Sequence, residues 1–532
     1  MKDVELFLAA TADKILPRIL TQIARDPGAP FYGACDRNWW HYKIRDFPSI
    51  ILQQAGYVLA TAATLPSGEA SSAKLEQLAA ATARFWNQRA MLHGAFEEYY
   101  PYEQGYPPVA FATLAVAKLC HQGVVPLADI RPGLAIAAKQ LLTRFEAEAA
   151  NQQIAGTAAL SVIRTVDPTL IEESAFQKIL SKILAIQHRE GWFPEYDGPD
   201  LGYLAVSIDC LWDILDHTGD ARVKAAIVSA ADCTAWFALS PLGAAGMHNS
   251  RNTDYFVPYG LVRLATEDAC PKATEVVRRL FTRKNPADFH PFDAVDDRYW
   301  CHYIGHSVLR ALALLNKHSQ APYSPPVPSY KLPSQKSGSG HALLGSATVS
   351  ALVSTRKGAI TTAVWPNGAS ANDFGWIVQT PRQLFVSHWW TPTWSIKASD
   401  VTAACEGYLV SHKEHLSAPW KHILLRVGSF LLGRRLIRVL KRLVIFKKPQ
   451  QTIYFSRSVS LDGQELVVQD TLTGVHQKDV ITRAPRTSKR HVASADSFHP
   501  EDFEMCRDVK MTEQIERTES SFLCITRYFL NN

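Results

Sequence analysis

The chain has 532 residues, of which 47% are hydrophobic and 20% are charged, so it can bury a large core and is not intrinsically disordered. Its formal net charge is only +6, which does not argue for a nucleic-acid partner. The sequence contains no run of about 18 uncharged apolar residues, which argues against a transmembrane helix. Asp3 and Glu5 precede the first short apolar stretch and argue against a secretory signal, so we expect a cytoplasmic protein.

Nine cysteines are scattered along the chain without a CxxC pair or a zinc-ligand spacing. An odd, dispersed set of this kind indicates reduced thiols in a reducing compartment. Because no ligand spacing requires a metal or a cofactor, we expect neither.

Residues 1–320 predict helices. Val4, Phe7, Leu8, Ile15, Ile19 and Ile23 recur near the helical period, and similar apolar stretches follow. We expect these further helices at about 46–65, 72–92, 108–121, 130–149, 168–186, 203–217, 221–238, 256–266, 270–282 and 303–316. Helices joined by short loops rich in Pro, Gly and aromatic residues indicate helical hairpins, arranged as a solenoid or as a closed α/α toroid. The lack of a strict sequence repeat disfavours a regular solenoid.

Residues 321–340 contain five prolines followed by Gly and Ser, which is typical of an extended linker. Short β-branched and aromatic runs come after it, at 347–355, 359–365, 376–380, 384–390, 452–461, 465–472 and 522–530. They predict an antiparallel β-sandwich over residues 341–532. The fold class that we expect is therefore α+β and multidomain, with a helical domain of residues 1–320 before the sandwich.

A basic segment at 419–449 interrupts the predicted sandwich. Between Lys421 and Lys448 lie nine Lys and Arg residues and no acid, more than the whole excess of positive charge in the chain. Arg434, Arg435, Arg438, Lys441 and Arg442 fall on one helical face, and apolar residues from Leu436 to Val444 take the other. A basic face opposite an apolar face is typical of a helix that lies on an anionic membrane surface. The alternatives are a core-packed helix with a solvated basic face, or a groove for an anionic substrate.

Five loops of the helical half combine aromatic residues with acids, amides, imidazoles and guanidinium groups. Aromatic faces that stack on sugar rings, beside planar hydrogen-bonding groups, suit a glycan cleft, and a toroid gathers such loops at one rim. The substrate-binding residues that we expect from these loops are Arg37, Asn38, Trp39, Trp40, His41, Tyr99, Tyr102, Glu103, Trp192, Asp200, Tyr203, Tyr299 and His302. Ordinary loop packing is the competing interpretation for each aromatic residue, and helix capping for Asp200 and Asp254.

The loop HNSRNTDY, residues 248–255, carries the most functional groups. Removal of the C5 proton of a uronic acid requires donors that neutralise the carboxylate and stabilise the enolate, together with a Tyr or His as base and another as acid. Proton delivery to the glycosidic oxygen at C4 cleaves the chain by β-elimination. Proton return to the opposite face of C5 gives epimerisation instead.

Three segments, DRNWWHYKIRDFP, EGWFPEYDGPDLGY and SRNTDYFVPYG, resemble the heparinase II/III-like family of polysaccharide lyases and related uronate epimerases. The resemblance covers about residues 30–315, and it implies an incomplete α/α toroid, an antiparallel β-sandwich and a cleft between them. It also implies that Tyr255 is the acid/base, that His248 is the histidine of the helical domain, and that Asn249, Asn252 and Arg251 neutralise the carboxylate.

The resemblance further implies a histidine from the sandwich, for which His388 is the first candidate and His412 and His415 the next. The Gly-His-rich segment that is usual in this domain of secreted members is not recognisable here. The expected activity is that of a lyase on a bacterial surface or capsular glycan that contains uronic acid, and a uronate C5-epimerase of polysaccharide biosynthesis is the alternative. We expect the protein at the inner face of the cytoplasmic membrane, attached through residues 421–448.

Two further hypotheses belong to other classes. An inverting glycoside hydrolase would use two carboxylates on opposite sides of a sugar, with Glu97, Glu98, Asp200, Asp254 and Asp297 as candidates. A membrane-attached glycan-binding or assembly factor would keep the fold without the catalytic base.

Overall fold

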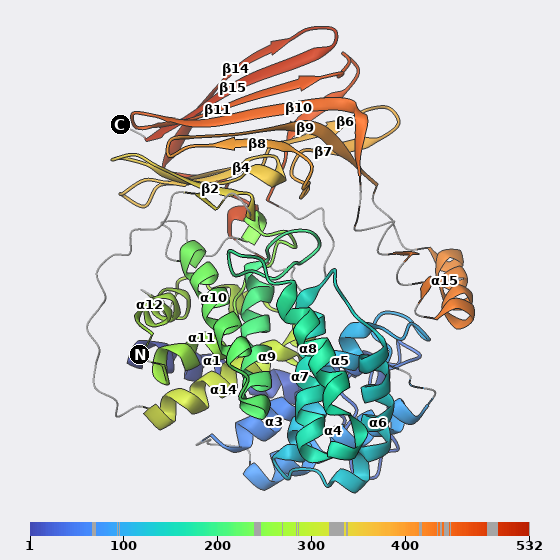
Figure 1. Cartoon of the computed structure of the whole chain (residues 1–532). Coiled ribbons are helices and arrows are strands. Elements are labelled where there is room, and N and C mark those ends of the chain that lie inside the picture. The colour runs from blue at the N-terminus through green and yellow to red at the C-terminus, as the bar shows by residue number, and fades with distance from the viewer. Residues whose placement is uncertain are drawn as a thin grey trace.

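A computed structural model gives the structure of residues 1–65, 71–92, 94, 96–238, 246–268, 270–283, 285, 287–318, 335–336, 339–413, 418–433, 435–436, 439–440, 446, 448–486, 498 and 500–530. Most of the predicted linker at 321–340 lies outside these residues, so the domain boundaries stay predictions. Helices fill the N-terminal part, and an antiparallel β-structure lies on top of them (Figure 1).

The helices follow one another through short connections. They are α1 Lys2–Gln22, α2 Arg37–Trp40, α3 Ala55–Ala63, α4 Ser72–Met91, α5 Tyr106–His121, α6 Leu127–Thr143, α7 Ala150–Val166, α8 Glu173–Ala185, α9 Leu201–Thr218, α10 Ala221–Ala238, α11 Tyr259–Thr266, α12 Pro271–Leu280, α13 Asp297–Trp300 and α14 Tyr303–His318. Local signals set several of these ends. The Asp200 side chain accepts a hydrogen bond from the Tyr203 amide at the start of α9, and Gly219 ends that helix with a φ of 65°.

Six of these helices form an inner ring. α3 contacts α5, α5 contacts α7, and the contacts continue through α9 and α11 to α14, which returns to α3. The outer helices pack against this ring, as α4 does against α3 and α10 against α9. The expected α/α toroid is confirmed, and its inner layer is more nearly closed than the resemblance implies.

Helix α7 differs most from the sequence prediction, which placed helices at 130–149 and 168–186 and none between them. Fourteen of its 17 residues are buried, including Asn151, Gln152 and Gln153. A helix that is buried all round has no polar face, so the period by which an amphipathic helix is recognised is missing. The preceding helix α6 ends at Thr143, six residues before the end that was expected.

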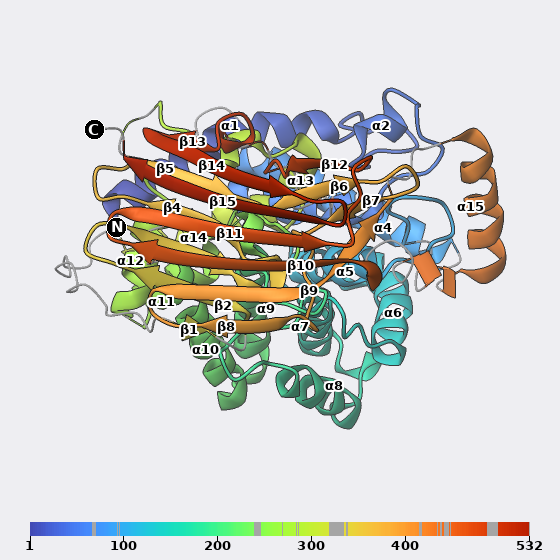
Figure 2. The ribbon, with the colours of Figure 1, turned by 90° about the horizontal axis from the view of Figure 1, so that it is seen from above.

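The strands form two antiparallel sheets, seen from above in Figure 2. One sheet has the order β1-β2-β3-β4-β5-β13, and the larger one has β12-β6-β7-β9-β10-β11-β15-β14, with β8 paired to β9. The strands are β1 Gln335–Lys336, β2 His341–Gly345, β3 Ser350–Ser354, β4 Ile360–Val364, β5 Ser370–Asp373, β6 Trp376–Gln379, β7 Leu384–Val386, β8 Ser395–Ala398, β9 Thr402–His412, β10 Pro449–Asp462, β11 Glu465–Thr473, β12 Val480–Arg483, β13 Cys506–Arg507, β14 Val509–Arg517 and β15 Ser521–Leu530.

The expected sandwich is confirmed because one apolar core joins the two sheets. Ala342, Leu344 and Ala351 of the smaller sheet pack in the same cluster as Phe455 and Val468 of the larger one. Strand β14 has no buried position that alternates with exposed ones, which explains why the sequence pattern did not predict it.

The basic segment is the connection between β9 and β10. It carries helix α15, Pro419–Leu432, which lies beside the toroid and away from both sheets (Figures 1 and 2). Arg434, Arg438, Lys441 and Arg442, on which the prediction of a basic face rested, lie outside the described residues, and Arg435 is the described member of that set. None of the helices within the described ranges is long and apolar enough to cross a membrane.

Candidate active site

Two loops of the toroid, at 190–200 and 246–255, face the sandwich and are bonded to it. The Trp390 indole donates to the Asp197 carbonyl at 3.1 Å, and a Cβ on Gly198 would lie 2.3 Å from the Trp390 ring. Glycine therefore stands in this motif because the sandwich approaches its backbone too closely for a side chain. Arg486 forms an ion pair with Asp254 across the same interface.

His248 and its neighbours serve this interface. The two ring nitrogens of His248 lie 2.8 Å from the Ser354 hydroxyl and 2.9 Å from the Thr362 hydroxyl, both in the sandwich. The buried Lys357 ammonium donates to the Asn249 carbonyl at 2.7 Å, to the Met247 carbonyl and to the Asn252 side chain. The structure therefore places these predicted catalytic residues in contacts that hold the two domains together.

The predicted carboxylate neutralisers also have internal partners. The Asn249 amide accepts from the Leu201 backbone at 3.1 Å and donates to the Thr253 carbonyl at 2.9 Å. Asn252 has a φ of 61°, a left-handed conformation that asparagine tolerates better than most residues. Both amides thus have local structural roles, and their assignment to the substrate carboxylate stays a prediction.

Arg251 supports the rim of the toroid from below. Its guanidinium forms a buried ion pair with Glu195 at 2.7 Å and lies over the rings of Tyr203 at 3.8 Å and Tyr196 at 4.5 Å. Its backbone amide donates to Asp200, which also caps α9. The capping role considered for Asp200 is therefore confirmed, and Arg251 positions Tyr203.

Tyr203, Tyr255, Tyr299 and Tyr303 form a tyrosine cluster where α9, α11 and α14 begin. Tyr303 is hydrogen-bonded through its side chain to both Tyr255 and Tyr203. Tyr255 is only 3% exposed, and burial followed by the neighbouring Tyr203 raises its pKa well above the usual range. The structure brings together three residues that the sequence selected, Tyr203, Tyr255 and Tyr299, and adds Tyr303, whose signal was its place beside His302.

Histidine 302 lies at the edge of the tyrosine cluster. Its ring centroid is 5.1 Å from that of Tyr299 and 6.1 Å from that of Tyr303. Burial, together with the nearby Arg298 charge, lowers the pKa of His302 to about 3. The imidazole is therefore neutral near pH 7, whereas Tyr255 is a protonated phenol. Environments that push the pKa values of two neighbouring titratable groups apart in this way are typical of acid/base pairs.

Glu98 is an acid close to the tyrosine cluster, because Tyr299 and Tyr203 act on the pKa of its neighbour Tyr99. It is buried and is hydrogen-bonded to Tyr99 through its side chain. Burial raises its pKa to about 7, although the Tyr99 hydrogen bond and the charges of Arg298, Arg45 and Arg251 act in the opposite direction. Its charge therefore changes close to neutral pH.

Arg298 was not selected from the sequence. It is half-buried, and among the described residues its guanidinium forms no hydrogen bond or ion pair. Its positive charge lowers the pKa values of Glu98 and His302, so Arg298 lies at the rim beside the tyrosine cluster. It is therefore a cation that no acid of the described chain neutralises by direct contact.

The other predicted substrate-binding residues are held mainly by contacts with neighbouring parts of the protein. Trp39 packs on Phe85, and the Trp40 indole donates to the Gln22 carbonyl at 2.8 Å. Glu103 accepts from the Tyr99 and Tyr100 amides, at 3.2 and 3.3 Å. Arg37 lies over the Tyr42 ring, Asn38 accepts backbone hydrogen bonds, and Trp192 stacks on His188. His41, Tyr99 and Tyr102 are the exposed members of the predicted substrate set.

His388 is buried directly after β7, two residues before the Trp390 that reaches the toroid loop. The structure thus places it on the sandwich side of the interface, and its catalytic role stays a prediction. His412, in strand β9, lies with its ring 6.0 Å from that of Trp389, and His415 is outside the described residues.

Most acids considered for a hydrolase have structural partners. Glu97 pairs with Arg89 at 3.1 Å, Asp297 with Arg18 at 2.6 Å, and Asp254 with Arg486. Asp200 caps a helix, so within the described part of the chain Glu98 is the one of these five acids without an ion pair or a capping role. Within the described residues there is also no group of three or more His, Cys, Asp or Glu side chains that could hold a metal ion.

No protein-family model matches the sequence, and no curated protein is detectably similar to it. Solved structures are similar. A chondroitin AC lyase of Streptomyces coelicolor A3 in complex with chondroitin sulphate aligns with 99% of this chain and 77% of its own, at 9% identity and a TM-score of 0.52. Heparinase III aligns with 100% of this chain and 92% of its own, at 10% identity and a TM-score of 0.37.

A further polysaccharide lyase aligns with 60% of this chain and 99% of its own, at 10% identity and a TM-score of 0.37. The likeness to the chondroitin AC lyase carries the assignment of the fold. The chain thus has the toroid-and-sandwich fold of that chondroitin AC lyase, which confirms the fold that the loop motifs implied.

Proposed function

We propose that this chain is a polysaccharide lyase that cleaves a uronic-acid-containing glycan of a bacterial surface or capsule by C5 proton abstraction and β-elimination. The observation that carries the proposal is the hydrogen-bonded series Tyr203–Tyr303–Tyr255 beside a neutral His302 and the unpaired Arg298. Acid, base and cation thus gather at one rim of a lyase fold.

In the reaction, Arg298 binds the substrate carboxylate and so makes the C5 proton more acidic. His302 accepts that proton, the electron pair forms the C4–C5 double bond, and the bond from C4 to the glycosidic oxygen breaks. Tyr255 gives its proton to the departing oxygen. The proton that His302 took then returns through Tyr303 to Tyr255, so that both residues regain their starting forms. This assigns the base to His302 in place of His248, whose ring nitrogens both bond to hydroxyls of the sandwich.

Substrate must displace the residues that cover Tyr255, because that side chain is almost completely buried. Tyr299, which is half-buried, and Tyr99, whose ring is exposed, form the solvent side of the site. Their rings are available to stack on the sugar while Glu98, with its pKa of about 7, lies below them.

The test is incubation with a panel of uronate polymers and measurement of the ultraviolet absorbance of the C4–C5 double bond. Tyr255→Phe should reduce the rate by about 10²–10⁴-fold, the usual range for loss of a general acid or base. Tyr106→Phe is the matched control, because that buried tyrosine bonds Gln153 at 2.9 Å outside the cluster. Equal loss in both variants would refute the role of Tyr255.

An epimerase would use the same residues, and proton NMR in heavy water separates the two reactions. An epimerase incorporates deuterium at C5 without shortening the polymer, whereas a lyase produces unsaturated ends. If wild-type protein gives neither signal on the panel, the proposed C5 chemistry is wrong. Glycan binding and cellular function that survive Tyr255→Phe would support the non-catalytic assembly factor.

The protein is further proposed to work at the inner face of the cytoplasmic membrane, with α15 as the element that contacts anionic lipid. Seven apolar side chains of this helix are 50–71% exposed: Trp420, Ile423, Leu424, Val427, Phe430, Leu431 and Leu432. Residues 420, 423, 424, 427 and 431 recur at helical spacing and form one face. A concentration of exposed apolar area on one element marks an interaction site.

Three contacts fix α15 to the rim loops. Arg426 pairs with Asp46 at 3.0 Å, Ser429 donates to the Pro101 carbonyl at 2.9 Å, and the Phe430 ring lies 5.4 Å from that of Tyr102. The helix is therefore held beside the loop that carries Glu98. This arrangement would hold the site close to a glycan that is assembled on the membrane.

A further inference from the structure

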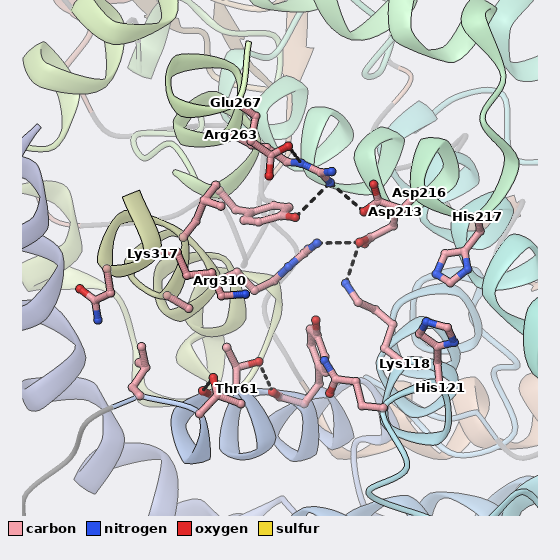
Figure 3. A pocket seen from close by; sticks show the side chains of 18 of the residues that line it. Thr61, Lys118, His121, Asp213, Asp216, His217, Arg263, Glu267, Arg310 and Lys317 are labelled. Carbon is pink, nitrogen blue, oxygen red and sulfur yellow. Dashed lines mark hydrogen bonds and ion pairs between the residues drawn. The ribbon is translucent and has the colours of Figure 1, made fainter. Parts of the chain in front are cut away.

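A cavity of about 850 Å³ lies at the end of the toroid opposite to the tyrosine cluster (Figure 3). Much of its lining comes from the C-terminal parts of the inner helices α3, α5, α7, α9, α11 and α14, or from residues just beyond them. Arg310 lies in the middle of α14, and Tyr57 and Tyr259 lie in the first turns of α3 and α11. The tyrosine cluster belongs to the other ends of α9 and α14, since Tyr203 and Tyr303 stand in their first turns. The cavity is therefore separate from the proposed active site.

Two buried cations share a single carboxylate in this cavity. The Lys118 ammonium and the Arg310 guanidinium each lie 2.7 Å from the same oxygen, Oδ1 of Asp213 (Figure 3). Burial alone would raise the pKa of Asp213, but Arg310 and Lys118 lower it to about 2, so the carboxylate is ionised. The group of three carries one excess positive charge, which the buried Asp209, whose pKa is raised to about 6, offsets in part by acting on Arg310.

Arg310 also has unused hydrogen-bonding capacity. Its Nη1 is buried and has no hydrogen-bond partner among the residues that the structure describes, and Arg310 as a whole is only 8% exposed. The guanidinium is held flat over the Tyr259 ring at 3.5 Å, so its orientation is fixed. A buried donor without an acceptor is destabilising, and a ligand oxygen would remove that cost.

The helix ends explain only part of this arrangement. Helix C-termini carry partial negative charge, which Lys118 in the last turn of α5 offsets, whereas Arg310 lies in the middle of α14. That effect requires neither an open volume nor a guanidinium nitrogen without an acceptor. Thr61, Thr64, Gln122 and Asn316 add hydroxyl and amide groups to the wall, which suit a polar ligand.

We infer that this cavity is a second binding site, which takes a small polar molecule bearing a carboxylate or phosphate. The anionic group accepts from Arg310 Nη1 and approaches Lys118, and the remainder of the molecule meets the hydroxyl and amide wall. Arg263 does not compete for the anion, because Asp216 and Glu267 hold it at 2.7 and 2.6 Å.

Ligand binding there would act on the same helices as the proposed reaction. Helix α14 carries both Tyr303 and Arg310, and α9 carries both Tyr203 and Asp213. A bound anion would therefore stabilise the ring that positions the hydroxyl groups. The inference itself does not rest on the proposed function.

The test is isothermal titration of the full chain with inorganic phosphate and, separately, with D-glucuronate. We expect saturable binding of at least one of them at one site per chain, and at least a tenfold weaker affinity in Arg310→Gln. Because Arg310→Gln also weakens a buried network, Ala313→Trp is the second variant. It fills the cavity from α14 without removing any of these polar groups, and it should abolish binding.

Arg507→Gln serves as the matched control and should leave the affinity unchanged, because it removes an exposed arginine of strand β13, outside both the cavity and the tyrosine cluster. A preference for phosphate or for glucuronate would distinguish the two sources of the anion. Lack of saturable binding of both anions to the folded wild-type chain would overturn the inference. Binding that survives in both cavity variants would overturn it as well.

Discussion

At the scale of single residues, Arg298 has two roles in the proposed site: it binds the substrate carboxylate and it acts on the pKa of Glu98. Its guanidinium has no hydrogen bond or ion pair to any residue that the structure describes, while the neighbouring arginines have partners, Arg45 with Asp36 and Arg251 with Glu195. It favours the charged form of Glu98, opposing the burial that raises the pKa of that carboxyl to about 7. Arg298 is thus available to bind an anion, and it also lowers the pKa of Glu98.

Replacement Arg298→Gln should lower kcat/KM on a uronate polymer by about 10²–10³-fold, the range for loss of one electrostatic donor. Any step near pH 7 in the pH–rate profile that is due to Glu98 should move to higher pH. The sign follows because loss of a nearby cation makes ionisation of a carboxyl less favourable. Steady-state kinetics across the pH range measures both effects.

Arg507→Gln is the control for that variant, since it removes an exposed arginine of strand β13 far along the chain. An Arg298→Gln protein that keeps its rate and its profile would show that another cation binds the carboxylate. A fall in rate with an unmoved profile would separate substrate binding from the effect on Glu98.

The sequence located the rim but not the division of roles within it. Tyr203, Tyr255 and His302 could be selected because their loops combine aromatic and polar groups. The partners of His248 could not be predicted, because Ser354 and Thr362 lie more than 100 residues away on another domain. The sequence of a loop does not show whether its histidine and asparagine side chains contact a substrate or a strand of the neighbouring domain.

At the scale of elements, α7 and α15 show opposite departures from amphipathic patterning. Helix α7 is buried all round, so its sequence lacks a periodic signal. Helix α15 keeps its apolar face in solvent, which a helix that packs only on its own domain would not do. The sequence identified the segment, and the structure shows that its apolar side is uncovered.

The double replacement Ile423→Glu with Leu424→Glu should reduce binding to vesicles of phosphatidylcholine and phosphatidylglycerol more than tenfold. Burial of each such side chain contributes about 1.5–3 kcal/mol, and two are lost. Vesicle co-sedimentation measures the effect, and pure phosphatidylcholine should bind the wild-type chain less well because it lacks anionic charge.

Val228→Glu is the matched control, because Val228 is an exposed valine on α10 and should not affect vesicle binding. If the α15 variant sediments with the vesicles as the wild-type chain does, α15 is not the membrane contact. The lyase assay on soluble polymer should be unaffected in either case.

At the scale of the whole molecule, the site depends on how the sandwich holds the toroid loop 246–255. Lys357 is central to this contact, because its buried ammonium bonds two backbone carbonyls and the Asn252 side chain in that loop. The same loop continues into Arg251 and Tyr255. Domain docking and the geometry of the tyrosine cluster are therefore coupled.

Lys357→Met should lower the free energy of unfolding by about 3–5 kcal/mol, because three buried acceptors lose their donor. We expect separate thermal transitions for toroid and sandwich, together with loss of lyase activity, since Arg251 would no longer be held under Tyr203. Calorimetry and denaturant unfolding measure these effects against Lys397→Met, which removes an exposed lysine of β8. If the Lys357→Met protein unfolds in one unchanged transition but loses activity, Lys357 takes part in the reaction instead. If both its unfolding and its activity are unchanged, the domains dock without this lysine.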